Sequence, residues 1–205
     1  AEEMDVLNAI VALLNFVVIP ATAYGAQLAL GALGATLIYG VLRFSNFAHG
    51  DTMGFGTAVT ILFTWWFQAH GITAGPLPTA LLALPFGIFF TILLVLATDR
   101  VVYRYYRTVK AKPVILVIAS MGVMFVMSGI TRFIIGVQEI KFSDGTKFVI
   151  EPGAFKAATG LSEALSMRTT QLLTVVTAVL VVAVLFWFLK NTRTGKSMRA
   201  YADNE

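Results

Sequence analysis

The sequence predicts an all-α fold, a polytopic transmembrane helical bundle with five or six membrane segments. Its 205 residues are 58% hydrophobic and only 13% charged, whereas about 25% of a soluble domain is charged. The apolar residues also gather in runs that approach the roughly 20 helical residues needed to cross a bilayer. We therefore expect one transmembrane domain over residues 1–205, and this composition excludes a nucleic-acid-binding module.

The first apolar run, residues 6–42, contains no charged residue. A straight helix of that length would measure about 55 Å, well beyond the hydrocarbon core of a bilayer. Pro20 lacks a backbone donor and glycines follow it, so we expect a break at about 20–28. One kinked crossing would leave the N-terminus outside, and two crossings would leave it inside.

Four further runs complete the predicted bundle. The first of them ends in Trp65 and Trp66, rings that favour the headgroup region. A proline inside another, Pro85, is tolerated where neighbouring helices satisfy the freed carbonyl. The predicted spans are 53–69, 76–98, 113–135 and 169–189.

Basic residues predict the orientation. Lys and Arg dominate segments 99–112 and 190–205, whereas acids balance them in segment 136–168. Because cytoplasmic loops carry the excess of Lys and Arg, we expect the first two segments to be cytoplasmic and 136–168 to be periplasmic or extracellular. Two predicted crossings separate the basic segments, which agrees with their sharing one side.

The segment Arg43-Phe44-Ser45-Asn46-Phe47-Ala48-His49-Gly50-Asp51 places polar groups between apolar spans. It is either a solvated interfacial loop or a segment that enters the bilayer and lines a pathway. A structural role is also open, in which Asn46 caps the next helix and Gly50 supplies an unusual backbone angle. His49 and Asp51 would face different sides of a helix.

The chain has two histidines and no cysteine, and it contains no HExxH, GxSxG or GxxxxGK[ST] pattern. We therefore expect no catalytic residue and no metal site. The basic segment 190–202 is either a membrane stop signal that meets anionic lipid or a docking surface for a cytoplasmic partner.

Four segments resemble one family. Residues 40–51, with Asn46-Phe47-Ala48-His49-Gly50, resemble the signature of the Liv-type permeases of branched-chain amino acid ABC importers. Residues 99–104, 118–122 and 192–200 resemble three other motifs of that family. Asp99 stands where the family usually has Glu, and Tyr105 where proline is common. Family members continue into further spans, so we expect the chain to be truncated at its C-terminus.

The resemblance implies a non-catalytic permease subunit in a bacterial inner membrane that moves branched-chain amino acids inward. It implies four kinds of partner: a second permease, ATP-binding subunits, a soluble substrate-binding protein and the lipid bilayer. The chain itself would hold no cofactor, with ATP and Mg on the partner subunits. Residues expected to line or gate the path are Asn46, Phe47, His49, Gly50 and Asp51. Residues expected to couple the chain to the ATPase are Gly195, Lys196, Met198, Arg199 and Ala200.

Two alternatives stay open. The chain could be a truncated permease relative that serves as a structural or accessory subunit of a larger membrane complex. It could also be a urea or amide permease, because the motifs do not separate those substrates from branched-chain amino acids. A channel is disfavoured, since the sequence has no repeated acidic ring.

Overall fold

The computed structural model describes residues 2–138, 142, 144 and 147–203. The chain forms two compact units. The first consists of Ala1–Leu33 and Gly145–Glu205, and the second of Gly34–Asp144. The helix α2 contains the boundary between them.

The chain is helical from Glu2 to Leu42, as α1 (Glu2–Leu13), the π-helical turn η1 (Leu14–Val18) and α2 (Ile19–Leu42). The predicted break at about 20–28 is not present, because α2 runs through it. The irregularity lies just upstream, where the N–H of Ile19 donates to the carbonyl of Leu14. Pro20 explains this position, since a proline ring clashes with the carbonyl four residues before it and a π turn widens the helix there.

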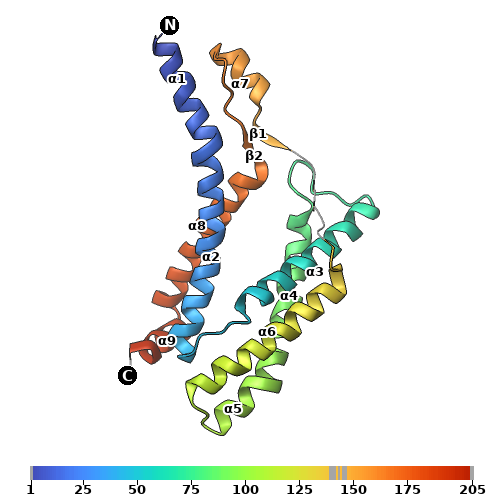
Figure 1. Ribbon diagram of the computed structural model, residues 1–205, viewed down its shortest axis with the longest axis vertical. Coiled ribbons are helices and arrows are strands. Elements are labelled where there is room, and N and C mark those ends of the chain that lie inside the picture. The colour runs from blue at the N-terminus through green and yellow to red at the C-terminus, as the bar shows by residue number, and fades with distance from the viewer. Residues whose placement is uncertain (1, 139–141, 143, 145–146, 204–205) are drawn as a thin grey trace. The chain divides into compact units, whose positions relative to one another are not determined.

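The rest of the first unit contains a small two-stranded sheet and the helices α7, α8 and α9 (Figure 1). Its strands are antiparallel, with Phe148 opposite Arg168 and Ile150 opposite Met167. The segment 136–168, predicted only as a polar loop, thus contains regular structure. The elements are β1 (Phe148–Ile150), α7 (Pro152–Thr159), β2 (Met167–Arg168), α8 (Thr169–Asn191) and α9 (Arg193–Asp203).

Asparagines of the N-terminal helix hold the loop between α7 and β2. The Oδ1 atom of Asn15 accepts from the N–H of Ser166 at 3.0 Å and from its hydroxyl at 2.8 Å. Asn8 Oδ1 accepts from the N–H of Glu163 at 3.2 Å. These bonds satisfy loop backbone groups that regular structure does not pair.

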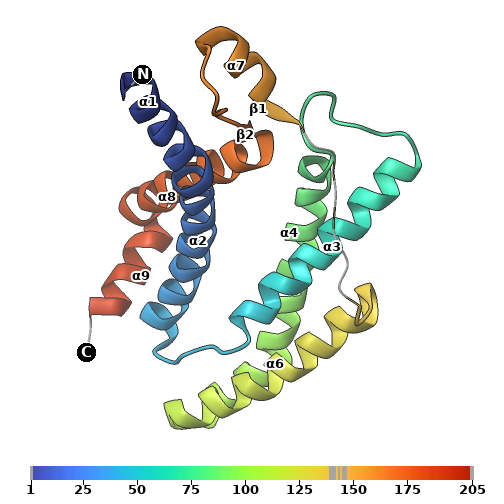
Figure 2. The same ribbon diagram turned by 45° about the horizontal axis from the view of Figure 1, so that its top comes forward.

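In the second unit, α3 packs against both α4 and α6 (Figures 1 and 2). The contact with α4 is close, because a Cβ on Gly87 would collide with the hydroxyl of Thr60 and approach the carbonyl of Gly56. Thr60 donates its hydroxyl to the Gly56 carbonyl at 2.8 Å, so this polar group is satisfied within the helix pair. The helices are α3 (His49–Ala69), α4 (Ala80–Thr98), η2 (Asp99–Tyr103), α5 (Arg104–Thr108) and α6 (Pro113–Ile135).

Four helical stretches of the described chain are long and apolar enough to cross a membrane. They are Glu3–Leu42, Ala80–Thr108, Pro113–Ile135 and Thr169–Asn191. The protein is therefore an all-α polytopic membrane protein. The predicted span 53–69 lies within α3, which is not among these four, so the count of five or six crossings stays a prediction.

The segment 99–112, predicted as a loop, is mostly helical. The helix α4 continues through the π-helical turn η2 into α5 and ends at Thr108. Arg107 bridges both carboxylate oxygens of Asp99, at 2.6 and 2.8 Å. Charged residues mark the end of an apolar run, but they do not stop a helix, and the next proline is Pro113.

Candidate functional site

The candidate site is built on residues 43–48, which we call the motif loop. It begins at Arg43, whose φ of 57° is left-handed, a region that residues other than glycine rarely adopt. The N–H of Arg43 still donates to the carbonyl of Tyr39 at 2.9 Å. The helix α2 therefore ends at a sharp reversal that turns the chain into the loop.

Ser120, on α6, fixes the backbone of the motif loop. Its side chain has no exposed surface, and its hydroxyl oxygen accepts from the N–H of Phe47 at 3.1 Å. The hydroxyl donates to the carbonyl of Val117 at 2.7 Å, with the carbonyl of Ser45 at 3.4 Å. One buried hydroxyl thus pairs a loop donor that would otherwise have no partner.

The side chain of Asn46 holds the loop in a second way. Its Oδ1 atom accepts from the N–H of Ala48 at 3.1 Å, a local side-chain turn typical of Asn and Asp. The hydroxyl of Tyr103, in η2, donates to the same oxygen at 3.2 Å. The amide oxygen therefore joins the start of α3 to the helical segment that follows α4.

The motif loop also carries part of the hydrophobic core of its unit. Phe44 is 3% exposed and Ala48 is 1% exposed. The ring of Phe44 packs against that of Tyr103, with 5.5 Å between centroids. Burial of this kind is worth about 1.5–3 kcal/mol for a large apolar side chain. The remaining buried members of this cluster are Leu116, Val123 and Met127.

The first turn of α3 contains the other predicted path residues, His49, Gly50 and Asp51. His49 lies against α2, because a Cβ on Gly34 would come within 2.7 Å of Cε1 and 2.8 Å of Nε2. Gly50 has an ordinary helical backbone, so the expected unusual angle occurs at Arg43 instead. Asp51 is an acid in the first turn of a helix, where the helix dipole favours negative charge.

A cavity of about 380 Å³ opens beside the loop. Hydroxyl, amide and aromatic side chains line it, a mixture that suits a small solute with polar and apolar parts. Phe47, one of the predicted residues, is 49% exposed at its edge. The lining residues are Ala35, Thr36, Tyr39, Ser45, Asn46 and Phe47.

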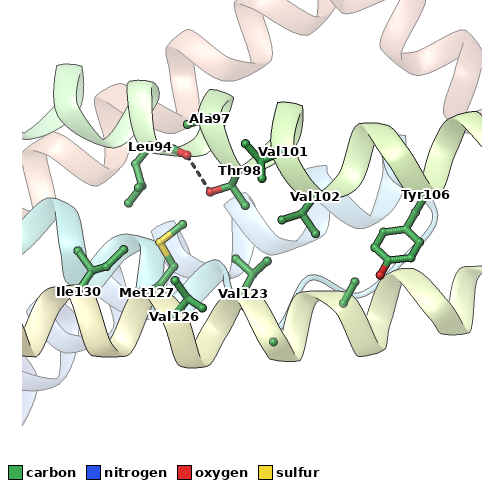
Figure 3. A pocket seen from close by; sticks show the side chains of 12 residues that line it. Leu94, Ala97, Thr98, Val101, Val102, Tyr106, Val123, Val126, Met127 and Ile130 are labelled. Atoms are coloured by element: carbon green, nitrogen blue, oxygen red, sulfur yellow. Dashed lines mark hydrogen bonds between the residues drawn. The ribbon is translucent and has the colours of Figure 1, made fainter.

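A larger groove, of about 550 Å³, lies between α6 and the α4–η2–α5 stretch. Figure 3 shows Leu94, Val101 and Val102 opposite Val123 and Met127. The hydroxyl of Thr98 is turned back to the carbonyl of Leu94 at 2.8 Å, so it does not offer its donor to the groove. This groove is apolar and suits hydrocarbon rather than a charged solute.

The predicted coupling residues lie on α9. Thr192 begins the helix with its hydroxyl oxygen accepting from the N–H of Gly195 at 3.0 Å, a standard N-terminal cap. A Cβ on Gly195 would collide with the carbonyl of Phe188 and with Leu189, so only glycine fits this corner after α8. Met198 is half-buried, whereas Lys196, Arg199 and Ala200 are exposed.

Sequence reasoning found the motif loop but missed the residues that hold it. Ser120 and Tyr103 lie 74 and 57 positions from Asn46, and no local pattern links them. Both fall inside segments that resemble the same family, 118–122 and 99–104, and this was the available signal. Among the described residues, no group of three or more His, Asp or Glu side chains could hold a metal ion.

The fold, with four helical stretches long and apolar enough to cross a bilayer, is that of a multi-pass helical membrane protein. Residues 18–205 match the family described as "Branched-chain amino acid transport system / permease component". The chain belongs to this family.

Individual relatives agree with the family. The chain is 27% identical over 188 residues to the high-affinity branched-chain amino acid transport system permease protein LivH of Escherichia coli K12. It is similarly 27% identical over 188 residues to LivH of Salmonella typhimurium, and 25% identical over 180 residues to BraD of Pseudomonas aeruginosa. Each match covers 88% of this chain, which spans 56% of the length of these relatives. No solved structure matches the chain.

Proposed function

We propose that the protein is the permease subunit of an ABC importer that moves branched-chain amino acids inward. The observation that carries this proposal is the family match over residues 18–205. The names of the relatives LivH and BraD give the substrate class. Hydrolysis of ATP, with its Mg, belongs to the separate ATP-binding subunits, and the chain contributes membrane helices without catalysis.

The path runs beside the motif loop and the first turn of α3, where Asn46, Phe47, His49, Gly50 and Asp51 line or gate it. The cavity next to the loop supports this site, because it offers hydroxyl and amide groups together with aromatic surface. The loop is rigidly held by Ser120 and Tyr103, which suits a site that must keep its geometry.

The exposed cations of α9 engage the ATP-binding subunit. Lys196 and Arg199 are both exposed on α9, so they are available to an acidic partner surface. Met198 and Ala200 complete the contact, and Gly195 fixes the direction in which α9 leaves α8. Partners that bind the inward and outward states with different affinity would bias the transport cycle.

The chain crosses a bacterial inner membrane five or six times, with α3 as the additional crossing. Segments 99–112 and 190–205 face the cytoplasm, and segment 136–168 faces the periplasm. The partners are a second permease, the ATP-binding subunits, a substrate-binding protein outside and the surrounding lipid. Nucleic acid is not among them.

Purification of the native complex in mild detergent, followed by intact-mass analysis and reconstitution into liposomes, tests this function. The proposal expects a second permease and an ATPase in the complex. It also expects uptake of labelled leucine. This uptake should require ATP on the side of the membrane that carries the ATPase and substrate-binding protein on the opposite side. Uptake of urea or short amides in place of leucine would change the substrate class. Unrelated partners and no uptake would indicate an accessory subunit.

A further inference from the structure

Three chain segments that are distant in sequence meet at the motif loop. Phe47 bonds to Ser120 across 73 positions, and Asn46 bonds to Tyr103 across 57 positions. Both contacts are made by hydroxyl groups on side chains that are at most 7% exposed. A buried hydroxyl is costly without a partner, so these bonds constrain the loop.

The Ser120 contact acts on the backbone. A serine hydroxyl has one donor, and here the shortest acceptor is the carbonyl of Val117 at 2.7 Å. Its oxygen remains free to accept the N–H of Phe47. Removal of the hydroxyl would leave that N–H without its acceptor, while α6 would keep its own backbone bonds. Ser120 therefore sets the loop conformation without being needed for the helix.

The Tyr103 contact acts on a side chain and starts from a different element. Tyr103 ends the π-helical turn η2, directly before Arg104. The same turn begins at Asp99, which is bridged to Arg107. Single π turns are rare and often occur at functional sites. A shift of the segment Asp99–Thr108 would therefore move the phenol that holds Asn46.

We infer that Ser120 and Tyr103 are positioning residues of the motif loop. Tyr103 belongs to the basic segment Asp99–Thr108, and its hydroxyl links that segment to the loop. Ser120 holds the loop backbone in its transport-competent conformation. Tyr103 transmits movement of the basic segment to Asn46, and through it to the start of α3. The inference rests on the proposed function, since the loop must belong to the path for this link to affect transport.

The chain has no cysteine, so Ser45→Cys places its only thiol on the exposed part of the motif loop. The rate at which a maleimide labels this thiol in the complete complex, in detergent, reports how firmly the loop is held. We expect Tyr103→Phe and Ser120→Ala each to raise the rate about five-fold, the effect of losing one modest hydrogen bond. The matched controls are Tyr105→Phe, a neighbouring exposed tyrosine, and Ser128→Ala on α6.

The link between Tyr103 and Asn46 has its own test. In a chain that already carries Asn46→Ala, Tyr103→Phe should not raise labelling further, because the acceptor is gone. Ser120→Ala should still raise it, since its contact is with Phe47 N–H. Equal effects of Tyr103→Phe with and without Asn46→Ala would overturn the link.

Leucine uptake separates the inference from the proposed function. Uptake is measured in chains without the Ser45→Cys change, because Ser45 lines the cavity of the proposed path. No uptake by the unmodified complex itself contradicts the proposed function, while labelling still tests the positioning. We expect Tyr103→Phe to lower the leucine transported per ATP hydrolysed about three-fold or more, with ATP hydrolysis retained. Unchanged labelling overturns the positioning role, and raised labelling with unchanged transport per ATP overturns the link to transport.

Discussion

The imidazole of His49 occupies the space that a side chain on Gly34 would need. A Cβ at that position would come within 2.7 Å of Cε1 and 2.8 Å of Nε2. These distances are well inside van der Waals contact, so α2 and the first turn of α3 meet through a glycine and a histidine ring. The position of the His49 ring therefore requires a glycine at residue 34.

Gly34→Ala should displace His49 or separate the two helices. Overpacking of this kind costs about 1–3 kcal/mol, and we expect a lower melting temperature in detergent together with reduced uptake. The matched control is Gly40→Ala on the same helix, where a Cβ meets nothing within 4 Å. Equal behaviour of the two variants in both measurements would contradict this packing.

His49→Leu should reduce leucine uptake while the complex with the ATPase still assembles. Leucine fills much of the same volume without the ring nitrogens, so a loss of uptake would reflect the polar groups of the path. His70→Leu is the control, because His70 is exposed beyond the end of α3, where its ring contacts the Trp66 carbonyl. Normal uptake by His49→Leu would assign His49 a packing role alone.

Single cysteines report the orientation. In sealed cells, Lys110→Cys and Lys196→Cys should be protected from an impermeant thiol reagent, whereas Lys156→Cys should react. Lys156 is an exposed residue of α7, and it is a better probe than Asp144. The carboxylate of Asp144 accepts hydrogen bonds from Gln68 and from the N–H of Ala80, both at 2.8 Å. The reverse labelling pattern would invert the topology.

Arg199→Glu should weaken binding to the ATP-binding subunit, since it reverses an exposed charge on α9. We expect at least a ten-fold loss of affinity at low salt, with a smaller loss at high salt, where surface charges are screened. Arg132→Glu, near the far end of α6, is the charge-matched control on another helix. Undiminished ATPase binding by Arg199→Glu would leave α9 only a role at the lipid surface.

Gly195→Ala tests the geometry of the same helix without changing its charge. The added methyl collides with backbone atoms at the end of α8, which cannot move aside as a flexible side chain can. We expect α9 to be redirected, which would uncouple ATP hydrolysis from uptake while the purified chain remains folded by circular dichroism. Wild-type coupling in this variant would show that the corner tolerates a methyl group.

The apolar runs predicted the helices well, because a helix that crosses the hydrocarbon core needs about 20 consecutive apolar residues. Their ends were predicted less well. The helix after residue 98 continues through Asp99 and Arg100, since charge marks a membrane boundary and not a helix boundary. Pro20 signalled a real irregularity, but the clash of its ring acts on the preceding turn, so the π turn lies at Leu14–Val18.

For the motif loop, the sequence identified the residues but not their contacts. Its polar residues stood out in the sequence, yet their partners could not be derived, because hydrogen bonds across 57 to 75 positions leave no periodic trace. The expectation that Asn46 caps the next helix was wrong, because the N-cap of α3 is Ala48 and has no side-chain cap bond. The Asn46 amide oxygen instead accepts from the N–H of Ala48, one residue before the helix begins. The expected angle at Gly50 did not occur, since that residue is already inside α3.

The left-handed backbone at Arg43 places two opposing requirements on one residue: the conformation favours glycine, whereas a positive charge requires a longer side chain. Glycine would adopt this conformation freely, whereas arginine does so at a cost of about 1–2 kcal/mol. Arg43→Gly would therefore relax the corner and at the same time delete a cation at the end of α2. If Arg43→Gly raises the melting temperature in detergent but gives a mixed membrane orientation, the backbone angle and the charge of Arg43 have separate roles.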